Sequence, residues 1–121
     1  MLATGALIFA TLSLAVADLG AMLAARSRAQ AAADSAALAA VVEQAPALAR
    51  SGNPRAAAEA EAEANGATLV SCSCDPGQPS AIVEVVVRPK LNMLTGWRGR
   101  DVHATARADV DPDVLTYRGP G

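Results

Sequence analysis

Two cysteines and one histidine are the residues of this chain whose types best suit chemistry. Cys72 and Cys74 are separated by a single residue, and His103 is the only histidine. On a strand, residues at this spacing point to the same face about 6.6 Å apart, at the edge of what a disulfide can bridge. Two thiolates and an imidazole also suit zinc, but no fourth ligand is evident. Three interpretations stay open: structural or unbridged thiols, a disulfide within or between chains, and a metal or redox site.

The rest of the sequence offers no catalytic or cofactor-binding motif. It contains no G-x-S-x-G, no phosphate-binding glycine loop and no H-E-x-x-H. Aromatic residues make up 2% of the chain, so Ala, Val and Leu must fill its interior, whereas a deep ligand pocket normally has larger walls. The net charge is −2, and no basic patch alternates with aromatic residues. We therefore expect a protein that is not an enzyme and that takes no cofactor, small-molecule substrate or nucleic acid.

The N-terminal segment is the part of the chain best suited to a membrane. Residues 1–25 carry one charge, Asp18, and as a helix they span roughly 37 Å, more than the ~30 Å hydrocarbon core of a bilayer. The tripeptide Ala15-Val16-Ala17 also fits a signal-peptidase site, but the segment has no basic start. We expect a retained transmembrane helix. An ionisable group there is costly, so Asp18 pairs with a partner helix or takes up a proton, unless it lies solvated among the headgroups.

Helical sequence continues beyond the apolar run. No proline occurs between Leu19 and Val42, and Pro46 predicts an end or a kink at Ala45. Gly20 is the only helix-weakening residue in this stretch. Small residues spaced four apart form one stripe, which lets another helix come close; they are Ala25, Ala29, Ala33 and Ala37, continued by Val41. The sequence predicts a shaft that packs against neighbouring helices, with Asp18 and Gly20 on its membrane part.

A second helix and three strands are predicted further along the chain. Asn53-Pro54 suits a helix start and Asn65-Gly66 a helix end, and the alanines expected to face a sheet are Ala56, Ala57, Ala60 and Ala64. Alternating apolar residues predict strands within 67–74, 81–89 and 101–110, and residues 114–117 offer a short fourth one. The fold class is therefore α+β. A long N-terminal helix (1–45) anchors a small domain (46–121) with an antiparallel sheet.

One loop of the predicted domain is rich in large apolar residues: Leu91, Met93, Leu94 and Trp97. Either it folds back to fill a core that is short of large side chains, or it offers an apolar contact to a neighbouring subunit or ligand.

The segment AVADLGAMLAARSRAQAAADSAALAA resembles the N-terminal signature of TadE/TadG-like proteins of Tad (Flp) pilus systems. In that family an apolar helix leads through Asp-Leu-Gly and a basic pair into a Gln-x-Ala-Ala-Asp motif. The polar positions of the motif are occupied here by Arg26, Arg28, Gln30 and Asp34. The later stretches ANGATLVSC, VEVVV and HATARADV are similar to the actinobacterial TadE-like branch. Arg55 stands where that branch often has a cysteine, so no helix-to-strand disulfide is carried over.

The resemblance implies a pilin-like fold and the role of a pseudopilin or minor pilin. The expected partners are the lipid bilayer and other pilin-like subunits, or copies of this chain, that contact its N-terminal helix. The expected place is a single pass in the cell membrane with the C-terminal domain outside the cytoplasm, although Arg26 and Arg28 alone favour the opposite orientation. Two alternatives remain: an exported binding domain with a cleaved signal peptide that recognises its ligand through residues 91–97, and a thiol-active exported protein that uses Cys72 and Cys74.

Overall fold

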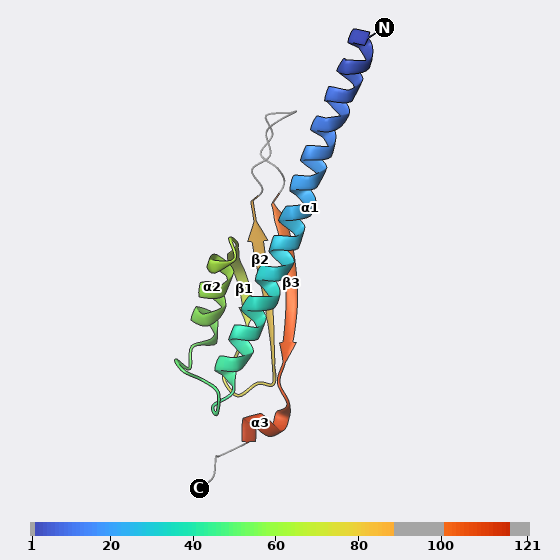
Figure 1. The fold of residues 1–121 in the computed structure, drawn as a ribbon. Coiled ribbons are helices and arrows are strands. Elements are labelled where there is room, and N and C mark those ends of the chain that lie inside the picture. The colour runs from blue at the N-terminus through green and yellow to red at the C-terminus, as the bar shows by residue number, and fades with distance from the viewer. Residues whose placement is uncertain (1, 89–100, 117–121) are drawn as a thin grey trace.

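The computed structural model describes residues 2–88 and 101–116, without the side chains of residues 2, 3, 14–18, 114 and 116. In this part of the chain three helices accompany one antiparallel sheet, in the order α1 (Leu2–Gln44), α2 (Pro54–Ala64), β1 (Thr68–Ser73), β2 (Ser80–Val87), β3 (Val102–Asp109) and α3 (Pro112–Thr116) (Figure 1). The predicted α+β class and antiparallel sheet are thereby confirmed. The predicted division at residue 45 stays a prediction.

The long helix α1 is continuous over 43 residues. Its C-terminal half lies along the sheet, and its N-terminal half projects beyond the sheet (Figure 1). The helix ends at Gln44, next to the predicted end at Ala45, because Pro46 has no N–H to donate and disfavours helical geometry at the residue before it. Among the described residues, no helix combines the length and the hydropathy that a membrane crossing requires.

Local capping interactions set both ends of helix α2. The Asn53 side chain accepts a hydrogen bond from Ala56 N (3.1 Å), and Pro54 occupies the first turn of α2. At the other end Gly66 has φ +78°, and Ala67 N donates to Ala62 O (2.9 Å), which is a Schellman stop. The predicted α2 is confirmed.

The C-terminal segment forms a helix where a short strand was suggested. Asp111 Oδ1 accepts a hydrogen bond from Asp113 N (3.0 Å), and Pro112 is the first residue of α3. A capping aspartate followed by proline favours a helix start over an extended strand. The suggestion of a fourth strand over 114–117 is therefore wrong for the described residues 114–116.

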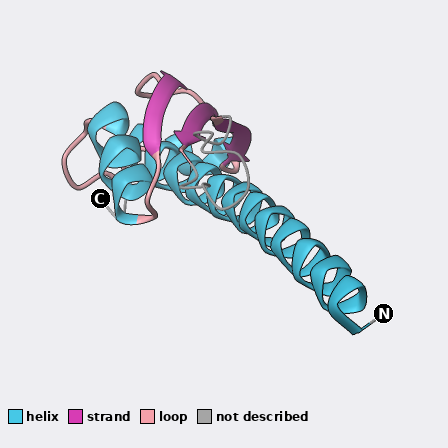
Figure 2. Ribbon diagram, turned by 90° about the horizontal axis from the view of Figure 1, so that it is seen from above, coloured by secondary structure: helices cyan, strands magenta, loops and turns pink. Residues whose placement is uncertain are grey.

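The sheet is a meander in the order β1-β2-β3, with both pairs antiparallel. Its inner face is formed by the alternating residues that the sequence pattern predicted: Ala81, Val83, Val85 and Val87 on β2, and Ala104 and Ala106 on β3 are all buried. Val70 interrupts the β1–β2 register between Leu69 and Ser71, which is a β-bulge. Helix α1 runs beneath the sheet with α2 beside it (Figure 2).

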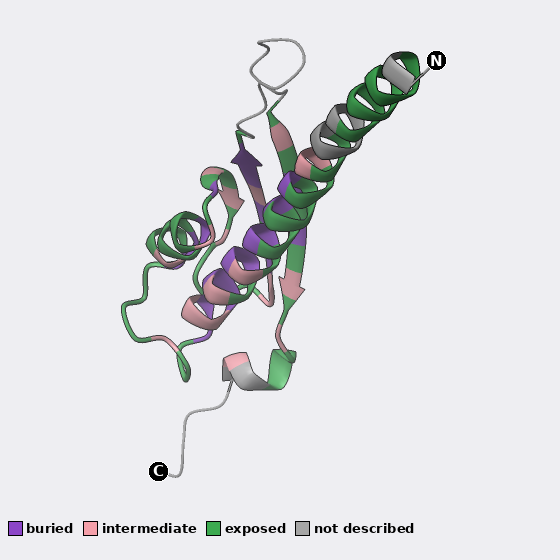
Figure 3. Ribbon diagram, turned by 45° about the horizontal axis from the view of Figure 1, so that its top comes forward, coloured by how far each residue is buried: buried purple, intermediate pink, exposed green. Residues whose placement is uncertain are grey.

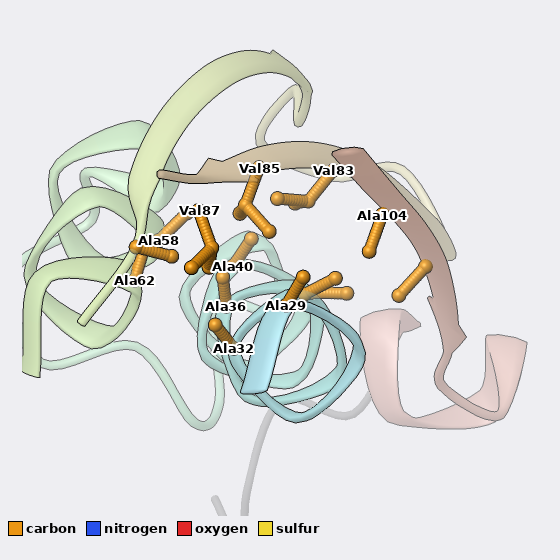
Figure 4. Close-up of a cluster of buried hydrophobic side chains, with 14 of the residues drawn as sticks. Ala29, Ala32, Ala36, Ala40, Ala58, Ala62, Val83, Val85, Val87 and Ala104 are labelled. Carbon is orange, nitrogen blue, oxygen red and sulfur yellow. The ribbon is translucent and has the colours of Figure 1, made fainter. Parts of the chain in front are cut away.

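The core between helix and sheet is built from very small side chains. Of the seventeen buried residues in the core cluster of the described chain, thirteen are alanine and four are valine. Figure 4 shows Val83 and Val85 directed from the sheet toward α1, with Ala58 and Ala62 of α2 at its side. Because methyl groups fill this space, the backbones of α1 and the sheet lie close together, and many weak contacts replace a few large ones.

The C-terminal end of α1 holds two loops in place through neighbouring side chains. Gln44 is buried, and its Nε2 donates to Gln78 O and Ser80 O at 2.9 Å each, which fixes the β1–β2 loop on the helix end. The carboxylate of Glu43 accepts from the backbone N–H groups of Arg50, Ser51 and Gly52 at 2.7–3.2 Å. The loop between α1 and α2 is thereby held against the C-terminal end of α1.

Candidate functional site

The alanine stripe of α1 is the first predicted contact surface to be placed. Ala29, Ala33 and Ala37 have no exposed surface, and Ala25 is 3% exposed. All four belong to the core cluster that α1 shares with α2 and the sheet. The prediction that this stripe packs against neighbouring subunits is therefore wrong, because the protein's own sheet already covers it. Small residues every four positions permit close approach, but they do not specify whether a helix or a sheet approaches.

The projecting half of α1, residues 2–24, is exposed at most of the positions whose side chains are described; the exposed positions are residues 4–13, 19, 20, 23 and 24 (Figure 3). Six of its large apolar side chains are more than half exposed: Phe9 at 75%, Leu7 at 67%, Ile8 and Leu23 at 57%, and Leu12 and Leu19 at 60–61%. Met22, next to the sheet, is of intermediate exposure. Soluble proteins rarely leave such a contiguous apolar surface uncovered unless it is a binding surface. This half of α1 is therefore the candidate functional surface.

Two polar side chains of the projecting half form their hydrogen bonds within the helix. The hydroxyl of Thr11 donates to Leu7 O at 2.9 Å, and that of Ser13 donates to Phe9 O at 2.9 Å. Both bonds stay within the helix, an arrangement compatible with an apolar environment. Apart from Gly20, its two chain neighbours and the nearby helix backbone, no heavy atom of the described residues lies within 4 Å of a Cβ placed at Gly20, so the position has room for a side chain. The side chain of Asp18 lies outside the described residues.

The four polar motif residues follow directly after the projecting half and are all exposed. Gln30 Nε2 donates to Asp34 Oδ1 (3.0 Å), a pairing one helical turn apart that leaves both side chains on the surface. Arg26 and Arg28 lie on two sides of α1 and line separate hollows. The structure thus brings the arginines to the level at which α1 leaves the sheet.

The two cysteines are joined to each other by a disulfide, with their Cα atoms 5.4 Å apart. This spacing is shorter than the extended-strand value, because Cys74 lies just past the end of β1. Both cysteines pack against the core cluster. Of the three interpretations left open by the sequence, the structure shows the intramolecular disulfide.

His103 lies apart from the cysteines, on the outer face of the sheet. Its Nδ1 is 3.0 Å from Glu84 Oε1 across the β2–β3 pair, and both side chains are partly exposed. Among the described residues no group of three or more His, Cys, Asp or Glu side chains is placed to hold a metal ion. The predicted contact residues Leu91, Met93, Leu94 and Trp97 lie outside the described residues.

Two charged residues outside the projecting half were not predicted from the sequence to have a role. Arg88, directly after β2, lines the same hollow as Arg28. Glu43 carries a carboxylate whose pKa is lowered to about 2, because the Arg50, Ser51 and Gly52 backbone N–H groups and the Ser51 hydroxyl all donate to it. No local sequence pattern indicates either role. Arg88 comes close to Arg28 only through the fold of two distant segments, and Glu43 binds the backbone across an irregular loop.

Comparison with known protein families finds a similarity in the N-terminal part of the chain. Residues 1–51 match the family model described as "Putative Flp pilus-assembly TadE/G-like". No curated protein and no solved structure matches the chain. The matched stretch comprises α1 and the start of the loop that Glu43 holds, and it includes the motif from Arg26 to Asp34. Over these residues the N-terminal part of the chain is similar to the TadE/G-like family of Flp pilus assembly.

Proposed function

We propose that this protein is a pilin-like structural subunit, a pseudopilin or minor pilin, anchored in the cell membrane by the projecting half of α1. In this proposal the domain formed by the rest of the chain lies outside the cytoplasm. The subunit serves in Flp pilus assembly or in an allied secretion or adhesion apparatus. The family match supports the pilus context, and no catalytic step is part of the proposal.

The exposed apolar surface of α1 is the observation that carries the proposal. Leu7, Phe9 and Leu12 stand free of the rest of the described chain, and residues 1–25 hold a single charge. Removing these side chains from water is favourable by about 1.5–3 kcal/mol for each one that is fully buried. A bilayer supplies that burial, and the α1 helices of other pilin-like subunits, or of copies of this chain, supply it within an assembly.

The test is alkaline extraction of membranes from cells that express the full chain, together with the N-terminal sequence of the extracted protein. We expect the chain to stay in the membrane fraction with residues 1–17 retained. Phe9→Asp and Leu12→Asp should release it, because an aspartate at the centre of a membrane helix costs about 3 kcal/mol. The matched control is Leu38→Asp, since Leu38 is an exposed leucine of the same helix beside the sheet.

A soluble mature protein that begins at Asp18 would contradict the proposal. That result would instead support the exported binding domain with a cleaved signal peptide. Release by Leu38→Asp to the same extent as by Phe9→Asp would also count against it, because the effect would then follow from a general loss of folding.

A further inference from the structure

A hollow of about 480 Å³ lies at the level where α1 leaves the sheet. Its walls are mainly small residues, among them Ala21, Ala24 and Gly66, and two arginines border it. Arg28 comes from α1 and Arg88 from the end of β2, so two separate elements bring positive charge to one recess. Nothing in the core or in the proposed anchoring uses this pair.

Both guanidinium groups are available to a ligand. Among residues 2–88 and 101–116, Arg28 forms no ion pair. Arg88 has one, a 3.7 Å contact between its Nε and Asp101 Oδ1, and its side chain is 82% exposed. An exposed pair of this length contributes little and is readily exchanged.

The turn after α2 gives Arg28 its place beside the hollow. A Cβ at Gly66 would lie 3.3 Å from Arg28 Cδ, so the stem of the arginine passes close against this glycine. Gly66 is required here for a second reason, since its φ of +78° ends α2. The turn therefore leaves room for the arginine.

The level of the hollow along α1 matches the edge of a membrane. Leu7 and Arg28 are about 31 Å apart along the helix at ~1.5 Å per residue, close to the ~30 Å thickness of a hydrocarbon core. If the projecting half of α1 is embedded, which is the proposed function on which this inference rests, Arg28 and Arg88 lie among the headgroups.

We propose that this hollow binds the phosphate of an anionic phospholipid headgroup, with the guanidinium groups of Arg28 and Arg88 as donors. Arginine matches phosphate oxygens with paired N–H groups, and small walls let a headgroup enter the recess. The subunit is thereby held at a fixed depth and rotation in the bilayer.

The test uses the full chain in a nonionic detergent, titrated calorimetrically with dihexanoylphosphatidylglycerol. Separate titrations use dihexanoylphosphatidylcholine and inorganic phosphate. Arg28→Gln with Arg88→Gln should weaken phosphatidylglycerol binding about 30-fold, from roughly fivefold per arginine. Arg50→Gln with Arg55→Gln removes the same charge at the other end of α1 and should leave binding unchanged. Both double variants replace exposed residues, and circular dichroism verifies their folding.

Equal losses in the two double variants, or none in Arg28→Gln with Arg88→Gln, would overturn the proposal. Inorganic phosphate that binds as tightly as the lipid would identify a free anion in place of a headgroup and would also overturn it. These results are independent of anchoring, because the titration is done in detergent. The membrane extraction described above tests anchoring, and Arg28→Gln with Arg88→Gln should remain in the membrane fraction there.

Discussion

Replacing Ala29 by leucine should destabilise the isolated subunit, because no space separates α1 from the sheet at this position. Ala29 has no exposed surface and lies in the core cluster beneath the strands (Figure 4). Leucine adds three carbon atoms, which must displace neighbouring side chains or the helix. Overpacking of this kind costs about 1–3 kcal/mol. In a domain of this size 1 kcal/mol corresponds to about 4–8 °C in Tm, so we expect a fall of roughly 4–24 °C.

The control for this substitution is Ala31→Leu, on the exposed side of the same helix. It adds the same atoms to the same helix, and surface changes usually stay within about 0.5 kcal/mol. The assay is thermal unfolding of the full chain in detergent, followed by far-UV circular dichroism. If both variants melt with the wild type while Ala29→Leu alone prevents assembly, the stripe contacts neighbouring subunits and the intramolecular core described above is wrong.

Three further predictions concern the loops and the disulfide. Gln44→Leu should cost about 1–2 kcal/mol of folding free energy, since two carbonyl acceptors lose their donor. Hydrogen exchange at Gly77 N, which donates to Gln44 O (2.8 Å) in the same loop, should accelerate. The lowered pKa of Glu43 stabilises the folded state above the ordinary carboxyl pKa of about 4.3. This stabilisation is lost as pH falls through about 2. Between about pH 4.3 and about pH 2, the urea midpoint of unfolding should therefore depend less on pH in Glu43→Gln than in the wild type. The disulfide between Cys72 and Cys74 closes only a very short loop, so Cys72→Ser with Cys74→Ser should lower the free energy of unfolding by only about 1–2 kcal/mol. Loss of pilus assembly in a double variant that remains folded would point to thiol chemistry.

Most secondary structure of this protein is readable from its sequence, because local signals and tertiary packing agree. Asn53-Pro54 and Asn65-Gly66 bound α2 through contacts that lie within a few residues of each other. Alternation of side chains gave the buried faces of β2 and β3, since a strand has one side on the core and one in water. Within residues 2–88 and 101–116, the segment after Pro112 departs from this, because capping there outweighs the apolar residues that suggested a strand.

Which face of each helix meets which partner could not be read from the sequence. In α2 the predicted face contained Ala56, Ala57, Ala60 and Ala64, but the alanines that are buried are Ala58 and Ala62. Alanine occupies nearly every non-acidic position of this helix, so no periodic contrast marks one side. The same ambiguity affects α1, where an alanine stripe suits a strand surface as well as a helix.

Side-chain size divides α1 into two parts with different partners. Beside the sheet its buried apolar residues are alanines and Val41, and a larger side chain, that of Gln44, is buried only at the last residue of the helix. Beyond the sheet its exposed residues include Leu7, Phe9 and Leu12, which need burial but have no described side chain of their own chain to provide it. Since α1 is a single unbroken helix, the direction in which the large residues point is set by the packing of the small ones. A change in the alanine core that tilts or turns α1 must therefore also reorient the surface through which the subunit is proposed to enter the membrane.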